Sequence, residues 1–143
     1  RKKVKSVVKG LVERAVIDGE STCTIANELA DEFENLSKGR SMLIARTEVA
    51  SASNNATLNA VKSLQVPNMQ KEWISSDDDR VRDGGKDGDG PDHAAMDGVK
   101  VGLDDTFTVP PDATMDGPGD VAGGASQICN CRCVLVFNST NRN

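Results

Sequence analysis

The sequence predicts an α+β fold, in which a helical lobe of about three helices over residues 1–66 precedes a small, loop-rich β lobe over residues 67–143. Apolar residues recur at helical spacing only before Pro67, and short extended runs occur only after it. Helices that are segregated from strands in this way are typical of α+β proteins, whereas βαβ winding would interleave them. A chain of 143 residues can bury one modest core or two small ones.

The first two helices are predicted from apolar stripes and turn residues. Seven apolar side chains share one face of the first helix: Val4, Val7, Val8, Leu11, Val12, Ala15 and Val16. Gly19 follows this stripe, in the position where a glycine often ends a helix. The second helix begins at Ser21 or Thr22, either of which can cap its first turn, and has its own stripe: Ile25, Ala26, Leu29, Ala30 and Phe33.

The third predicted helix is the longest. It begins after Ser37, a good N-cap, and continues to about Leu64, because Pro67 prevents a further turn. Small residues along one face would let another helix approach closely: Ala45, Val49, Ala52, Ala56 and Ala60. Three asparagines of low helix propensity form either a hydrogen-bonded seam or a solvated face: Asn54, Asn55 and Asn59.

The predicted β lobe consists of short strands separated by long acidic loops. The first strand covers residues 69–74 and contains Trp73, the single tryptophan, as a core anchor. Residues 83–91 have the composition of a loop, and Pro91 breaks the pattern that a calcium-binding EF-hand would need. The remaining pieces follow in order: an Asp-Gly turn at 97–98, an extended run at 99–101, another at 104–109 that two prolines end, and a Gly/Pro/Asp-rich loop at 112–126.

The last predicted strand begins at residue 128 and holds three of the four cysteines. Side chains alternate between the two faces of a strand. One face would therefore carry Cys129, Cys131, Cys133, Leu135 and Phe137, and the other Asn130, Arg132, Val134 and Val136. A disulfide between residues two positions apart is strained, so we expect free or metal-bound thiols.

The only histidine, His93, can combine with Cys131 and Cys133 in a zinc site. A metal would tie the histidine loop to the last strand, which suits a β lobe with little core. The fourth ligand would be one of three residues: Asp79, Asp92 or Cys129. The alternative is a packed site, in which two small buried thiols lie beside a histidine that is hydrogen-bonded to a carboxylate.

Composition limits the classes of function. The net charge is −5, and although six basic residues lie within the first 14, residues 77–120 are dense in aspartate. A protein that coats nucleic acid would be basic overall, so only the basic face of the first helix favours a DNA-binding accessory role. The chain has no Tyr, one Trp and three Phe, too few rings for a platform that stacks single-stranded bases. No apolar run is long enough to cross a membrane.

Seven short motifs carry a resemblance to a known family. In order, they are Ile44-Ala45-Arg46-Thr47-Glu48-Val49 with Asn54 and Asn55 after it, Lys71-Glu72-Trp73, Asp79-Arg80-Val81-Arg82, His93-Ala94-Ala95-Met96-Asp97-Gly98, Asp104-Asp105-Thr106-Phe107, Pro118-Gly119-Asp120 and Asn130-Cys131-Arg132-Cys133. Together they cover roughly residues 20–137 and resemble the phage Mu F-like minor head protein family, also described as phage head morphogenesis proteins. Residues 84–91 depart from that pattern as extra loop. Position 129 is apolar in the family, so the resemblance implies that Cys129 fills core.

The resemblance implies a minor structural protein of a tailed-phage head, acting in head morphogenesis near the portal vertex. It implies no established catalytic residue. The implied partners are the portal protein, capsid subunits and packaged double-stranded DNA, without membrane contact, and the implied location is the virion, or the host cytoplasm during assembly. The family domain also occurs fused to portal proteins or toxin-like modules, and this chain begins with Arg rather than Met, so we expect one Mu F-like domain of a longer polypeptide.

Five residues of these motifs are expected to form a structural polar network between the helical lobe and the acidic loops: Arg46, Glu48, Asn55, Asp79 and Arg82. The alternative function is a metal-dependent enzyme, nuclease-like or toxin-like, that acts on nucleic acid. A nuclease needs convergent carboxylates, whereas the aspartates here lie in loops whose composition predicts mobility. We therefore expect a structural protein rather than an enzyme, with at most one structural zinc ion as cofactor.

Overall fold

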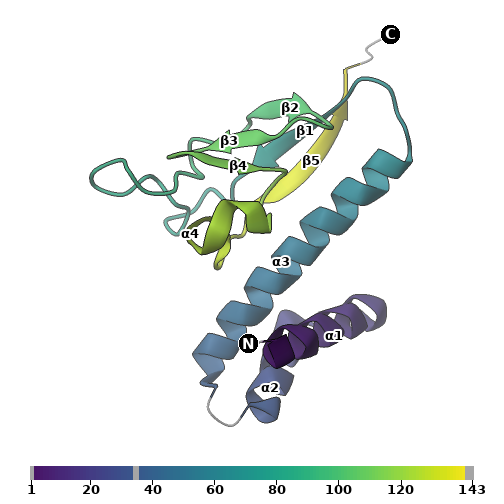
Figure 1. Cartoon of the computed structure of the whole chain (residues 1–143), viewed down its shortest axis with the longest axis vertical. Coiled ribbons are helices and arrows are strands. Elements are labelled where there is room, and N and C mark those ends of the chain that lie inside the picture. The colour runs from purple at the N-terminus through teal and green to yellow at the C-terminus, as the bar shows by residue number, and fades with distance from the viewer. Residues whose placement is uncertain (1, 34–35, 141–143) are drawn as a thin grey trace.

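The computed structural model describes residues 2–33 and 36–140 and confirms the α+β fold (Figure 1). Three helices precede two small antiparallel sheets, one with the strand order β2-β1-β5 and one that pairs β3 with β4. None of the helices in the described ranges is long and apolar enough to cross a membrane. The elements are α1 (Lys2–Asp18), α2 (Thr22–Glu32), α3 (Lys38–Ser63), β1 (Met69–Ile74), β2 (Lys100–Gly102), β3 (Phe107–Val109), β4 (Ala113–Met115), the 3-10 turn η1 (Val121–Gly123), α4 (Gly124–Ile128) and β5 (Val134–Ser139).

The helices begin and end where their terminal residues predict. The Ser21 hydroxyl accepts a hydrogen bond from the Thr24 amide, and the Ser37 hydroxyl accepts one from the Arg40 amide. Gly19, just after α1, has a φ of 70°, a left-handed conformation that glycine adopts without steric cost. These local signals confirm the predicted boundaries, because each satisfies backbone groups that a helix end leaves without partners.

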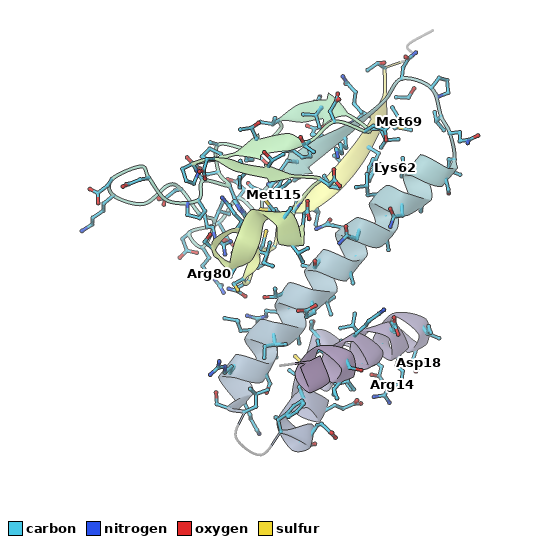
Figure 2. The ribbon with its side chains drawn as sticks, viewed as in Figure 1. Arg14, Asp18, Lys62, Met69, Arg80 and Met115 are labelled. Atoms are coloured by element: carbon cyan, nitrogen blue, oxygen red, sulfur yellow. The ribbon has the colours of Figure 1, made fainter. Side chains whose placement is uncertain are left out.

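The helical lobe has its own core, formed by Val8, Leu11, Val12, Ala15, Ile25, Ala26, Leu29 and Ala45. The two predicted stripes supply most of it, and the side chains of Val4 and Val16 lie outside those described. Ala45 is fully buried, which confirms close helix packing on the first half of α3, but Ala56 and Ala60 are exposed on the second half. Arg14 of α1 points away from the β lobe and pairs with Glu28 at 2.9 Å (Figure 2).

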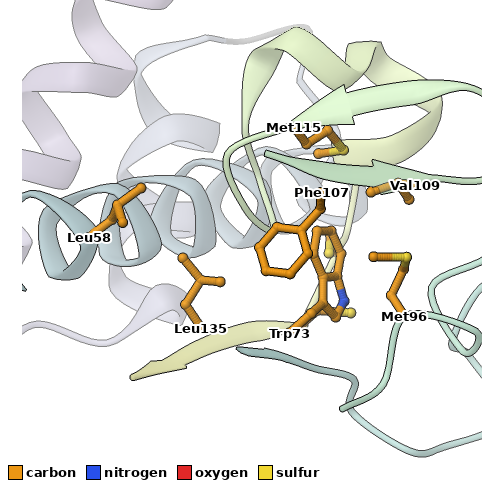
Figure 3. Packing of buried hydrophobic residues seen from close by; sticks show 9 residues of the cluster. Leu58, Trp73, Met96, Phe107, Val109, Met115 and Leu135 are labelled. Atoms are coloured by element: carbon orange, nitrogen blue, oxygen red, sulfur yellow. The ribbon is translucent and has the colours of Figure 1, made fainter. Parts of the chain in front are cut away.

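The core of the β lobe is arranged around Trp73 of β1 (Figure 3). The indole is fully buried and makes edge contacts with the rings of Phe107 and His93, at centroid distances of 5.5 and 5.2 Å. This confirms the tryptophan as the core anchor. Leu58 of α3 joins the same core, together with Met96, Val109, Met115, Cys131, Cys133 and Leu135. Helix α3 thus contributes to both cores.

Asn54 attaches α3 to the β lobe. It is 7% exposed, and its amide nitrogen donates to the carbonyl oxygens of Pro118 at 3.0 Å and Cys133 at 3.1 Å. Its amide oxygen accepts from the backbone N–H of Leu135 at 3.1 Å. The predicted hydrogen-bonded seam is therefore confirmed for Asn54. Asn55 and Asn59 are exposed, as the alternative of a solvated face predicted.

The predicted strand across the cysteines was wrong in its first half. β5 begins only at Val134, residue 128 ends α4, and Asn130 has a φ of 56°. A left-handed residue turns the chain and cannot continue a strand. Cys129, which the family resemblance places in the core, is exposed before this turn. From residue 131 onward the expected alternation holds, since Cys131, Cys133 and Leu135 are all buried.

The Gly/Pro/Asp-rich segment at 112–126 is not one loop, because it contains β4, η1 and most of α4. Elements of three to five residues are too short to show a period in the sequence. Asp120 orders the segment, since its carboxylate accepts from the amides of Asp116 at 2.7 Å and Ala122 at 3.0 Å.

Replacing Asn54 with leucine should lower the free energy of unfolding by about 3 kcal/mol, because two carbonyls and one N–H lose their partner in a buried position and each such group costs about 1–3 kcal/mol. Urea unfolding measures the change. Asn55→Leu, at the exposed neighbour on the same helix, is the matched control and should change it by less than about 0.5 kcal/mol. Equal effects of the two substitutions would contradict the role of Asn54.

Candidate metal centre

Three ligating side chains from distant parts of the chain meet in the β lobe. His93 Nδ1 lies 3.5 Å from Cys131 Sγ and 3.6 Å from Cys133 Sγ. The ligand atoms of the three residues all lie within 4.8 Å of one another, and all three residues are buried. Imidazole nitrogen and thiolate sulfur are ligands that zinc prefers. The group can therefore hold a metal ion.

Backbone hydrogen bonds and α3 place these ligands. The His93 amide donates to the Arg82 carbonyl at 2.8 Å, next to the bridge between Asp83 and Asp92. The cysteines follow the turn at Asn130, whose amide donates to the Thr47 hydroxyl of α3 at 2.9 Å. Because Asn54 of the same helix bonds to Cys133, α3 holds the turn at both of its ends.

The second ring nitrogen of His93 also has a partner. His93 Nε2 lies 2.8 Å from Gln127 Oε1, and the Gln127 amide nitrogen donates to the Pro110 carbonyl at 2.8 Å. The packed alternative predicted a carboxylate at this place, and the structure has a neutral amide. Sequence reasoning missed Gln127 because it lies in α4, a helix of five residues at the boundary between the expected loop at 112–126 and the predicted last strand.

The two thiols affect each other's protonation. The hydrogen bond with Cys133 lowers the pKa of the Cys131 thiol to about 7, against the effect of burial, and the positive charges of Arg82 and Arg132 act in the same direction as the hydrogen bond. The same hydrogen bond, together with burial, raises the pKa of Cys133. Cys131 is therefore the thiol of the pair that loses its proton first, and a bound cation would replace the remaining proton.

Arg132 lies between the two cysteines and forms a bidentate ion pair with Asp78. This hydrogen-bonded pair lowers the pKa of the Asp78 carboxyl to about 2. Arg82 donates to the carbonyl of Cys129 in the same turn. The two arginines therefore connect the cysteine turn to the segment at 77–83.

The five residues expected in the polar network do not come together. Three of them, Arg46, Glu48 and Asn55, are exposed on α3. Asp79 is also exposed and forms an ion pair with Arg80 at 3.9 Å. Arg82 donates to the Cys129 carbonyl. The pair between Arg132 and Asp78 joins the acidic segment to the cysteine turn instead. Among the residues that the structure describes, none of the three candidates for a fourth ligand joins the group: Asp79, Asp92 and Cys129.

Comparisons with known proteins add to this geometry. A family model described as "Phage Mu protein F like protein" matches residues 6–136. The chain is also similar to the minor head protein GP7 of Bacillus phage SPP1, with 29% identity over 132 residues, which are 88% of this chain and 38% of the relative. The chain thus spans about two fifths of that relative's length. No solved structure gives a significant match.

Replacing Arg132 with glutamine should raise the pKa of Asp78 from about 2 toward the ordinary aspartate value of about 3.9, because the hydrogen-bonded guanidinium is the main cause of the shift. A carboxyl NMR titration measures it. In the wild type the pair stabilises the fold above the ordinary pKa, and this contribution is lost as the pH falls through about 2. Arg80→Gln is the control and should leave most of the shift in place. An unchanged Asp78 titration in Arg132→Gln would contradict this assignment.

Proposed function

The chain belongs to the phage Mu protein F-like family, and from this premise we propose that it is a minor structural protein of a phage head that acts in head morphogenesis near the portal vertex. The observation that carries the proposal is the family match over residues 6–136, which includes both lobes, His93 and the two buried cysteines. The similar protein of Bacillus phage SPP1 is a minor head protein, which supports the same role.

The His-Cys-Cys group is proposed to hold one structural zinc ion. His93 is 1% exposed and Cys131 and Cys133 are each 3% exposed, whereas a catalytic zinc keeps a position that substrate can reach. The group links the loop at residue 93 to the turn before β5, so a bound ion would close a connection of about forty residues within a small lobe. Such a connection restricts the unfolded chain and stabilises the folded lobe.

The arrangement of the aspartates argues against the enzyme alternative. Asp77, Asp78, Asp79, Asp83 and Asp97 line one cleft, but Asp78 is paired with Arg132. In the described part of the chain, His93, Cys131 and Cys133 form the only group of three ligating side chains close enough to share a metal. A nuclease that uses metal ions needs carboxylates in such a group. We therefore propose a protein without catalytic activity.

DNA binding through the basic face of α1 receives little support from the described side chains. Lys9 pairs with Glu13 at 3.6 Å and Arg14 with Glu28 at 2.9 Å, so both cations already have an acidic partner. The other basic positions of this face lie outside the described side chains: Arg1, Lys2, Lys3 and Lys5. Nucleic acid binding needs cations that are free to neutralise phosphates.

The proposed partners are the portal protein and capsid subunits, without membrane contact. Contact with packaged double-stranded DNA would have to use residues other than Lys9 and Arg14, which are paired with acids. The proposed location is the virion, or the host cytoplasm during assembly. We also propose that the lobes at 1–66 and 67–143 act as one unit, since Asn54 and Leu58 of α3 are both packed into the β lobe.

Protein purified without added metal should contain about one zinc ion per chain, measured by elemental analysis, and a chelator should lower the melting temperature of the β lobe. Trp73, the single tryptophan, lies in that lobe, so its fluorescence reports on the β lobe while far-ultraviolet circular dichroism reports mainly on α1 to α3. Cys131→Ser and Cys133→Ser should lose the metal and the native fluorescence but keep most of the helical signal.

Cys129→Ser and Cys23→Ser are the matched controls, because both cysteines are exposed and stand outside the ligand group. If the thiols only fill core, Cys131→Ala and Cys133→Ala should each cost roughly 1 kcal/mol and the chelator should change nothing. Substoichiometric zinc together with a chelator-insensitive melt would defeat the metal proposal.

When expressed with the portal and capsid proteins of its own phage, the chain should co-purify with portal rings or proheads. Asn55→Leu should co-purify as the wild type does, whereas Asn54→Leu, which releases α3 from the β lobe, should associate less. Sedimentation of assembled particles followed by detection of the chain measures the outcome. A folded wild-type chain that never sediments with either particle would overturn the head-protein proposal.

A further inference from the structure

We propose that Gln127 is a positioning residue of the metal centre: its amide, oriented by the Pro110 carbonyl, keeps the proton of His93 on Nε2 so that Nδ1 presents a lone pair to the two thiols. This inference rests on the proposed metal centre. It adds a residue outside the ligand group, and that residue selects which ring nitrogen binds the ion.

The Pro110 carbonyl determines the orientation of the Gln127 amide. One end of the amide lies 2.8 Å from the Pro110 carbonyl oxygen. A carbonyl oxygen only accepts hydrogen bonds, so the NH2 group must face it. The amide oxygen then faces the other way, toward His93. Pro110 thereby removes the ambiguity between the two ends of a glutamine amide.

The orientation of this amide in turn determines the tautomer of His93. Gln127 Oε1 lies 2.8 Å from His93 Nε2 and can only accept, so Nε2 carries the proton. A neutral imidazole has one such proton, which leaves a lone pair on Nδ1. That nitrogen faces Cys131 Sγ at 3.5 Å and Cys133 Sγ at 3.6 Å. The tautomer that binds metal through Nδ1 is therefore the one that the protein selects before any metal arrives.

The site is buried, so no water can take the place of the Gln127 amide as the partner of His93 Nε2–H. Gln127 is 2% exposed and His93 is 1% exposed, and the Trp73 ring lies nearly perpendicular to the imidazole with the ring centroids 5.2 Å apart. Without the amide, the Nε2–H would be buried without a partner, at a cost of about 1–3 kcal/mol. The ring would then favour the other tautomer, with a proton on Nδ1 directed at the thiols, and that proton occupies the place of the metal.

The test measures metal affinity in the full chain with zinc and cobalt as probes. Gln127→Leu should lower zinc affinity 10–100-fold in competition with a chelator, the usual effect of losing such a partner. It should also weaken the thiolate-to-cobalt absorption bands. Gln127→Glu, whose carboxylate still accepts from Nε2–H, should bind more tightly than Gln127→Leu. Gln70→Leu, which removes an amide from β1 outside the metal centre, is the control and should bind as the wild type does.

A second readout needs no metal. His93 is the only histidine, so nitrogen NMR assigns its ring without ambiguity. The metal-free wild type should carry the proton on Nε2, and Gln127→Leu should shift the population toward a proton on Nδ1. This measurement tests the inference even if Gln127→Leu folds poorly, because a proton on Nδ1 of His93 in the metal-free wild type would overturn it.

The two proposals fail in different ways. If the wild type binds neither zinc nor cobalt, the proposed metal centre is wrong, and the proposed role of Gln127 is wrong as well. If the wild type binds zinc and Gln127→Leu binds it equally well, the metal centre stands and Gln127 has no positioning role.

Discussion

The geometry of the β lobe depends on one side-chain amide of α3. The Thr140 amide donates to the Asn68 carbonyl, which extends the pairing of β1 and β5 by one residue pair. In an antiparallel pair, hydrogen-bonded and non-hydrogen-bonded positions alternate. Even-numbered residues of β5 therefore bond to β1, and odd-numbered residues direct their backbone N–H and C=O groups away from β1. The Asn54 side chain hydrogen-bonds to two of these groups, the Cys133 carbonyl and the Leu135 amide, in the way that a neighbouring strand would pair with them. Helix α3 thereby covers part of an edge strand that would otherwise be open to pairing with another chain.

The same contact also helps to place the ligand group. A helix is rigid over its length, and α3 holds the cysteine turn at Asn130 through Thr47 and at Cys133 through Asn54. Hydrogen bonds to a hydroxyl and to a backbone carbonyl therefore set the position of the cysteine turn relative to α3. Sites that are held by a rigid element in this way lose little conformational freedom when the ligand binds.

The sequence was informative where a structural signal is local. Ser37 predicts a helix start from its own hydroxyl, and Trp73 predicts a core from its size, so both were correct. The left-handed turn at Asn130 was missed because the same cysteine spacing also fits a strand. Residue types alone indicated His93, Cys131 and Cys133 as possible ligands, but neither they nor the family resemblance indicated partners such as Asp78 and Gln127.

Those partners could not be predicted because each contact joins residues that are distant in the chain. Arg132 and Asp78 are 54 positions apart, and His93 and Gln127 are 34 apart. Many aspartates in the acidic loops carry the same charge as Asp78, so composition does not distinguish the one that pairs. Only the folded backbone decides which carboxylate reaches the guanidinium.

The polar content of the β-lobe core indicates what a bound metal would add to this lobe. Lys71 is fully buried, donates to the Asp116 carbonyl at 2.8 Å and lies 5.5 Å from the centre of the Phe107 ring, and its burial lowers the pKa of its ammonium group. Together with His93 and Gln127, it replaces apolar volume in a lobe whose sheets are only two and three strands wide. Buried polar groups specify one geometry but contribute less net stability than apolar packing. A metal bond between the loop at 93 and the turn before β5 would supply stability that such a core does not provide, and it would do so without enlarging the lobe.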